Sequence, residues 1–292
     1  MRVTETLRFD LVSRRLSTLR SKYQQTALES TTGQRVNAPS DDPVAAAEAA
    51  RVRAGLAQSQ ANTRSIDLVK GDVEMAEAAL DQAGNVFQRA REIAMAGANG
   101  ANGSDQRQAL AIEANQLVSQ VIEIANAKGS QGYLFAGTRW DAPAFDSTGA
   151  FVGNDQQHLV QTGAGEPIAV NVSGSQAFTS AGGIDVIQEL RNLAEGLKSE
   201  DMDAIRSTLD GLQTAHEQVQ RERSHAGLIL NRIQLSETIL NQTDLDLSRR
   251  ETDVVTADPT ETFSRLSQLE GAINNSVTVG KRLLDIGNIQ RF

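Results

Sequence analysis

Residues 66–94 read IDLVKGDVEMAEAALDQAGNVFQRAREIA, and this stretch decides the fold class. Its apolar residues recur at alternating spacings of three and four, the pattern of helices that pair along a seam. The positions that carry the pattern are Ile66, Val69, Val73, Ala76, Leu80, Ala83, Phe87, Ala90 and Ala94. The stretch therefore predicts a long helix with one apolar face packed against another helix.

The same spacing extends toward both ends of the chain. Near the N-terminus it is carried by Phe9, Val12, Leu16, Leu19 and Tyr23, and after residue 94 it resumes in residues 110–124. Toward the C-terminus it is carried by residues 212–247 and then by Phe263, Leu266, Leu269, Ile273 and Val277, before Leu283 and Leu284. Because both ends share the pattern, they can meet as a pair. The sequence predicts a mainly α protein, an elongated antiparallel helical bundle or coiled coil formed by N- and C-terminal arms.

Three breaks separate the expected helices. Residues 37–43 (NAPSDDP) are typical of a turn, after which Asp42 can cap free backbone amides and Pro43 suits the first helical position. The glycine-rich residues 97–103 form the second break, and residues 258–259 form the third.

The middle of the chain has a different composition. Residues 129–183 hold 10 of the 23 glycines and 6 of the 11 aromatic residues. Apolar and polar residues alternate over residues 167–172, between glycines that favour turns. We therefore expect a small β-rich insertion at residues 138–182, between the two helical arms.

Composition excludes several classes of function. The net charge is −9 and no long basic tract occurs, which argues against nucleic-acid binding. The chain has no cysteine, so disulfides, thiolate metal sites and cysteine nucleophiles are excluded. No run approaches the ~20 apolar residues that span a bilayer, and residues 1–13 lack the apolar core of a signal peptide. By themselves these features predict a cytoplasmic protein, unless a special export route operates.

No motif of an enzyme or a metal site is found. The glycine-rich residues 97–103 follow a helical pattern and lack the Lys-Ser/Thr ending of a phosphate loop, and no nucleophile elbow or dinucleotide fingerprint occurs. His216 and His225 lie nine residues apart, too far for a metal pair on one helical turn. Asp41 and Asp42 are explained by capping rather than by cation binding. We expect no catalytic residue, no metal and no cofactor.

Three strings resemble the bacterial flagellin family, which comprises filament flagellins and the junction proteins of the hook. The first is residues 32–43 (TGQRVNAPSDDP), and the second is residues 89–94 (RAREIA), followed by a glycine-rich turn and SDQR at residues 104–107. The third is residues 132–138 (GYLFAGT), which is similar to the junction proteins in particular. The resemblance covers residues 1–140 and about 183–292.

The resemblance implies a structural subunit of the bacterial flagellum. It implies an adaptor at the hook–filament junction, exported through the flagellar type III channel without a cleaved signal peptide and located outside the cell. The implied partners are a neighbouring hook-associated protein, flagellin, identical subunits and, in the cytoplasm, an export chaperone. Neither nucleic acid nor membrane insertion is implied.

The resemblance also implies a division of the chain into three layers. Residues 1–42 with 251–292 would form an inner coiled-coil layer, and residues 43–137 with 183–250 a helical rod domain. Residues 138–182 would form a small outer domain. The residues expected to serve assembly are Phe9, Val12, Leu16, Leu19, Tyr23, Arg35, Asn37, Asp41, Asp42, Arg89, Arg91, Leu266, Leu269, Ile273, Leu283 and Leu284.

Some interpretations stay open at this point. Arg89 and Arg91 can serve subunit contacts, or they can pair within the helix with Glu92 or nearby acids. The two ends have polar residues at seam positions, so we expect them to be largely disordered in the monomer and to order against neighbouring subunits. The alternative functions are a short flagellin that forms the filament itself, and a secreted coiled-coil binding protein or adhesin that displays the β insertion.

Overall fold

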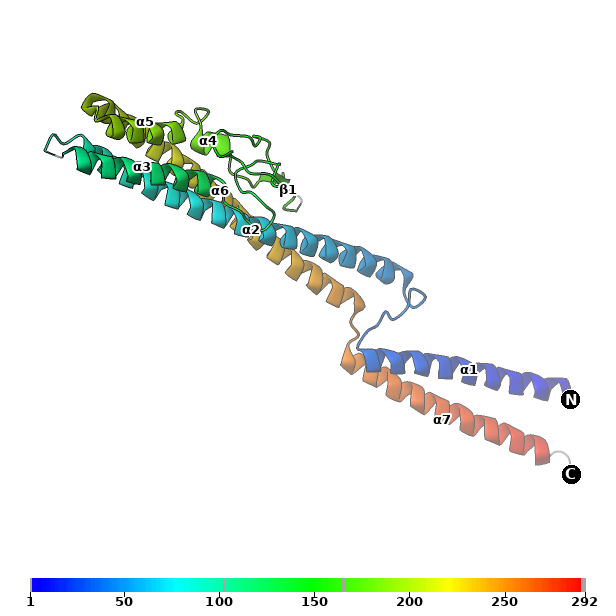
Figure 1. The fold of residues 1–292 in the computed structure, drawn as a ribbon. Helices are drawn as coiled ribbons and strands as arrows, with labels where there is room; N and C mark the ends of the chain where they lie inside the picture. Colours follow the sequence, from blue (N-terminus) through cyan, green and yellow to red (C-terminus); the bar gives the residue numbers. More distant parts are fainter. Residues whose placement is uncertain (1, 102, 164–165, 290–292) are drawn as a thin grey trace. The chain divides into compact units, whose positions relative to one another are not determined.

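The computed structural model describes residues 2–101, 103–163 and 166–289 (Figure 1). The elements in chain order are α1 (Arg2–Thr32), α2 (Pro43–Gly97), α3 (Ser104–Ala125), β1 (Leu159–Val160), β2 (Ile168–Ala169), α4 (Gly174–Phe178), α5 (Val186–Ser199), α6 (Met202–Val255) and α7 (Pro259–Ile289). The prediction of a mainly α protein built from long antiparallel helices is confirmed. Helix α2 begins at Pro43, so the helix start expected there is also confirmed. The break expected at residues 258–259 lies at the start of α7.

The chain divides into two compact units. The first unit comprises Met1–Gln58 with Asp244–Phe292, and the second unit comprises Ser59–Thr243. Helices α2 and α6 each contribute residues to both units. The three-layer division drawn from the resemblance stays a prediction.

In the first unit, α1 and α7 lie side by side and run antiparallel (Figure 1). Helix α1 ends where Gly33 adopts a left-handed φ of 68°, and the Gly33 N–H donates to the carbonyl of Glu29 at 2.9 Å. The N–H of Arg35 then donates to the carbonyl of Val255 at 2.7 Å, and that of Ala257 to the carbonyl of Gly33 at 3.0 Å. These backbone bonds tie the end of α1 to the chain just before α7.

In the second unit, the predicted seam of α2 is the core. All nine of its residues are buried, none of them more than 4% exposed. They face the buried residues of α6, which include Leu212, Ala215, Val219, Ala226, Ile229, Ile233 and Leu240. Such a continuous apolar seam is the main source of stability of this unit.

Ion pairs flank this seam and fix the register of α2 against α6. Lys70 Nζ lies 2.9 Å from Glu237 Oε1. Arg223 bridges two acids of α2, with its Nε 2.5 Å from Glu77 Oε1 and its Nη1 on Asp81. The two helices are antiparallel, so residues near 70 lie abreast of residues near 237, and residues near 77 abreast of residues near 223.

The middle of the chain has little regular β structure. Strands β1 and β2 pair antiparallel, with Leu159 opposite Ala169 and Val160 opposite Ile168. Elsewhere the backbone is held by an isolated antiparallel bridge between Phe145 and Phe151 and by side chains. Asn154 Oδ1 accepts from the N–H of Thr138 at 3.0 Å. A small sheet is thus present in the middle, as predicted, but turns and loops make up most of residues 138–182.

Aromatic residues supply the core of this middle segment. Phe135, Phe145 and Phe178 are each at most 1% exposed, and the ring of Phe178 meets the other two edge-on, at centroid distances of 5.4 Å and 5.7 Å. Asn126, at the end of α3, holds the segment by a pair of bonds to Phe145, accepting from its N–H and donating to its carbonyl, both at 2.9 Å.

Among the helices that the structure describes, none combines the length and the hydropathy of a membrane-spanning segment.

Candidate assembly interface

The facing seam of α1 and α7 is only partly covered. On α1, the predicted residues Val12, Leu16, Leu19 and Tyr23 are half-buried, as are Leu266, Leu269 and Ile273 on α7. Among the side chains that the structure describes in these two helices, the buried ones are polar: Thr26, Glu29 and Thr262. The pair therefore lacks the closed apolar core that α2 and α6 form in the second unit.

Large apolar side chains also lie on the outside of this pair. Leu7, Phe9 and Leu11 of α1 are 64%, 56% and 66% exposed, and Phe263 of α7 is 64% exposed. Exposed apolar side chains such as these are available for contact with another protein. The side chains of Leu283 and Leu284, also predicted to serve assembly, lie outside the described residues.

The turn after α1 is built from four of the predicted residues. Arg35 Nη1 lies 2.9 Å from Asp42 Oδ2, and Arg35 Nη2 donates to the carbonyl of Val254 at 2.9 Å. Asp41 Oδ2 accepts from the N–H groups of Asn37 and Ala38 at 3.1 Å and 2.8 Å. These contacts are all within the chain, so they order the turn; a role in subunit contacts stays a prediction.

Asp42 also caps α2, as the sequence predicted. Its Oδ1 accepts from the N–H groups of Val44 and Ala45 at 3.2 Å and 3.0 Å. The bond from Ala45 and the ion pair with Arg35 hold the pKa of the Asp42 carboxyl below its ordinary value of 3.8. Asp42 is therefore charged at neutral pH, where it can stabilise both the helix start and the turn.

Arg89 and Arg91 have different surroundings. Arg89 bridges two acids, with its Nε 2.7 Å from Glu113 Oε1 of α3 and its Nη1 2.7 Å from Glu92 Oε2. Glu113 and then Glu92 raise the pKa of the Arg89 guanidinium. Arg91 is half-buried, and its Nε is buried without a hydrogen-bond partner among the described residues. Arg89 thus links α2 to α3, while subunit contacts by either arginine stay a prediction.

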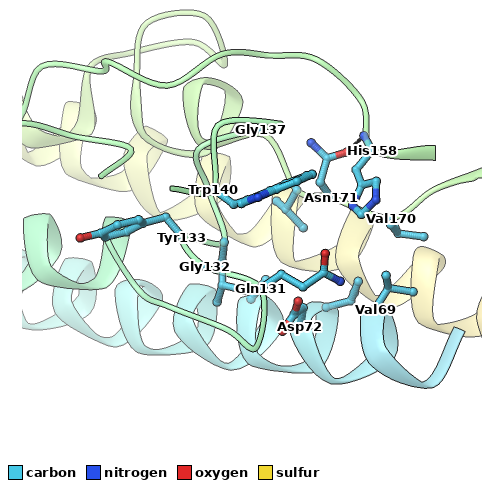
Figure 2. A pocket seen from close by; sticks show the side chains of 14 residues that line it. Val69, Asp72, Gln131, Gly132, Tyr133, Gly137, Trp140, His158, Val170 and Asn171 are labelled. Carbon is cyan, nitrogen blue, oxygen red and sulfur yellow. Dashed lines mark hydrogen bonds between the residues drawn. The ribbon is translucent and has the colours of Figure 1, made fainter. Parts of the chain in front are cut away.

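A small recess lies between α2 and the middle segment (Figure 2). Its volume is about 50 Å³, and Trp140 and His158 line it with ring centroids 5.4 Å apart. Asp72 also lines the recess, and its Oδ1 accepts a hydrogen bond from the backbone N–H of Ser130 at 2.6 Å. Pockets for small organic ligands usually measure roughly 300–1,000 Å³, so the recess has room only for water-sized molecules.

Some side chains that fix the middle segment were not found from the sequence. Asn126 and Gln218 bond to backbone groups 19 to 41 residues away. No local pattern marks such residues, because a polar residue within a helix is most often solvated.

Comparison with known proteins gives matches to proteins of the bacterial flagellum. The model of the bacterial flagellin N-terminal helical region matches residues 11–139. Flagellar hook-associated protein 3 of Escherichia coli is 24% identical over 300 residues, covering 94% of this chain and 95% of that protein. The chain thus resembles flagellar hook-associated protein 3 over nearly its whole length, and the flagellin model over its N-terminal part. Flagellar hook-associated protein 3 of Salmonella typhimurium is 26% identical over 182 residues, and that match spans 57% of the Salmonella protein and 62% of this chain.

A similar fold is found in a solved structure. A putative flagellar hook-associated protein from Vibrio parahaemolyticus matches with a TM-score of 0.66 at 22% identity, over 74% of this chain and all of that chain. The likeness over nearly the whole chain is to a protein of the bacterial flagellum, in agreement with the structural role that the sequence predicted.

Proposed function

We propose that this chain is the subunit that joins the hook to the filament, at the hook–filament junction outside the cell. The observation that carries the proposal is the match to a flagellar hook-associated protein 3 over nearly the whole length of both chains. The α1–α7 pair supports it, because the two ends of the chain meet in a seam that is only half covered.

The half-covered seam is suited to an inner layer of a tubular assembly. Leu16 on α1 and Leu269 on α7 each lie partly in contact with the partner helix and partly open to solvent. Neighbouring copies would cover the remainder, together with exposed residues such as Phe9 and Phe263. Fully burying an exposed apolar side chain contributes about 1.5–3 kcal/mol, and covering the open part of several half-buried ones would add a share of this for each, so a neighbour on this surface would stabilise the pair.

The junction position determines the partners. A hook-associated protein would contact one end of the layer, flagellin the other, and identical subunits would lie on either side. An export chaperone would bind the chain in the cytoplasm before it passes through the flagellar channel. Contacts of this head-to-tail kind build rings or helical layers rather than closed dimers.

The test is immunogold electron microscopy on intact flagella of a strain that carries only the plasmid copy of the gene. A single band of label at the outer end of the hook is expected. Label along the whole filament would make the chain a flagellin, and flagella without label would contradict both positions and favour a secreted binding protein.

A variant of the half-covered seam sharpens this test. Leu16→Asp places a charge in the seam, so the protein should still be made but should not be retained at the hook. Ser17→Asp, one residue along on the exposed side of α1, is the matched control and should be retained. Equal retention of the two variants would contradict the role of the seam in assembly.

A further inference from the structure

Helix α2 has a second apolar series on its solvent side, within the second unit. Leu68, Gly71, Met75 and Ala78 follow each other at spacings of three, four and three. Leu68 and Met75 are 56% and 51% exposed. At Gly71 no atom lies within 4 Å of the position that a Cβ would occupy, so the glycine leaves an open notch between the two larger side chains. We call these four residues the outer seam of α2.

Helix α6 has a matching series. Leu228, Leu235 and Ile239 are spaced by seven and four residues, and each is more than half exposed. They are large branched side chains, and more than half of the surface of each is left uncovered by the described part of the chain. We call them the outer seam of α6.

The two outer seams cannot meet within one chain. The buried face of α2, with Val69 and Val73, and the buried face of α6, with Ile229 and Ile233, join the same core. On each helix the outer seam lies about half a turn away from these buried residues. The outer seams therefore point away from each other, and each is open to another molecule.

The charges beside the two outer seams are complementary. Asp67 and Glu74 flank the Gly71 notch on α2, and neither is in a close ion pair within the described residues. The nearby Lys70 is bound to Glu237, and Glu74 and Asp67 add to the charge around it. On α6, Arg232 is exposed between Leu228 and Leu235 and makes no ion pair within the same part of the chain. Asp67 and Glu74 beside the notch thus correspond to Arg232 on the other helix, while exposed Arg64 lies one turn before Leu68, at the end of the outer seam.

The register of the two helices brings the matching groups to the same level. The Lys70–Glu237 and Glu77–Arg223 pairs place Met75 abreast of Leu228 and Leu68 abreast of Leu235. By the same register Arg232 is level with Gly71, between Asp67 and Glu74. Two copies side by side at equal height would therefore match apolar groups with apolar groups and Arg232 with the two acids.

We propose that the outer seam of α6 in one copy docks onto the outer seam of α2 in the next copy of this chain. This inference rests on the proposed function and names the surface by which identical subunits contact each other laterally. The Gly71 notch admits close approach of the neighbouring helix, and the contact repeats because each copy offers both surfaces.

Cysteine cross-linking tests this contact, because the chain has no cysteine of its own. The variant Met75→Cys/Leu228→Cys is produced in the strain described above, and its isolated flagella are oxidised and run on a non-reducing gel. Disulfides form only when the two Cα atoms approach to roughly 4.4–6.8 Å, so a ladder of multimers reports contact between copies. Met75→Cys/Leu235→Cys detects the same contact if it is shifted by one heptad.

The control is Met95→Cys/Leu228→Cys. Met95 is 55% exposed on the same helix but lies on another face, so this variant should give no ladder. Absence of a ladder from both test variants, with the protein present at the hook, would overturn the inference and leave the proposed function intact. Absence of the protein from the flagella, with the wild type absent too, would overturn the proposed function and this inference with it.

A charge exchange gives an independent readout. Arg232→Glu and Glu74→Arg should each lower the amount of protein retained at the hook, by about two- to fivefold for each contact. The combined variant restores opposite charges and should recover retention. A combined variant no better than either single variant would overturn the proposed pairing.

Discussion

Replacing Gln218 by leucine should destabilise the second unit. Gln218 lies on α6, is 1% exposed, and holds the segment that connects α4 to α5. Its Oε1 accepts from the N–H of Ile184 at 3.0 Å, and its Nε2 lies 2.9 Å from the carbonyl of Thr179 and 3.2 Å from that of Ile184. Leucine has a similar size but can make none of these bonds.

The size of the effect follows from the groups left without partners. A buried backbone group that loses its partner costs about 1–3 kcal/mol. The Ile184 N–H and the Thr179 carbonyl are the two groups with the shortest bonds to Gln218, and Ile184 is partly open to water, which can replace some of the loss. We therefore expect the free energy of unfolding to fall by about 2–4 kcal/mol. With a denaturant slope near 2 kcal/mol/M, the urea midpoint should fall by about 1–2 M.

Urea unfolding followed by fluorescence measures this change, because Trp140 is the chain's single tryptophan and lies in the middle segment. Gln234→Leu, at an exposed position of the same helix, is the matched control and should change stability by no more than about 0.5 kcal/mol. A Gln218→Leu midpoint that moves no further than that of the control would refute the reasoning.

Four further measurements test other parts of the structure. Arg223→Met should lower stability by about 0.5–1.5 kcal/mol in low salt, and the difference should shrink in 1 M NaCl, since the pairs that it removes are partly exposed. Gly71→Ala should raise the thermal stability of the monomer by about 0.5–1 kcal/mol, because the site is open and alanine favours the helix. The folded-state pKa of Asp42 is lowered, so the carboxylate stabilises the folded protein above its ordinary pKa of 3.8, and this stabilisation is lost as the pH falls below that value. The melting temperatures of Asp42→Ala and the wild type should therefore converge at low pH. Amide exchange on the monomer should be fast in residues 5–25 and slow in residues 66–94, and strong protection of residues 5–25 would contradict ordering on assembly.

The helices could be predicted from the sequence because their signals are local. The three–four spacing of residues 66–94 selects one face, and that face is the one the structure buries. Asp42 and Pro43 mark the start of α2 by a cap and a missing N–H, both of which act within a few residues. Such features depend little on the rest of the chain.

The middle segment could not be predicted to the same extent. Alternation in residues 167–172 predicts a strand, but only Ile168 and Ala169 pair with another strand. The N–H of Val170 donates to the carbonyl of His158, while Asn171 bonds through its side chain to the backbone of His158 and Gln156. The Asn171 side chain thus takes bonds that would have extended the ladder beyond Val170, and such a contact depends on residues distant in sequence.

The outer seams show another limit of sequence patterns. Leu68 and Met75 lie within the same stretch as the buried seam, and an apolar spacing does not state which face finds a partner inside the chain. The structure resolves this point because it shows Val69 and Val73 buried while Leu68 and Met75 are exposed. Only then do the exposed residues become a candidate surface for another copy.

The same spacing has two outcomes in this chain, and the difference bears on function. In the second unit it yields a closed core, with the α2 seam facing α6. In the α1–α7 pair, Val12, Leu16 and Leu269 remain half-exposed, so burial offsets less of the roughly 1–2 kcal/mol that ordering each backbone residue costs. We therefore expect the second unit to fold by itself and the pair to depend on neighbours. A subunit with that division can travel as an incompletely folded chain and complete its fold where its partners cover the seam.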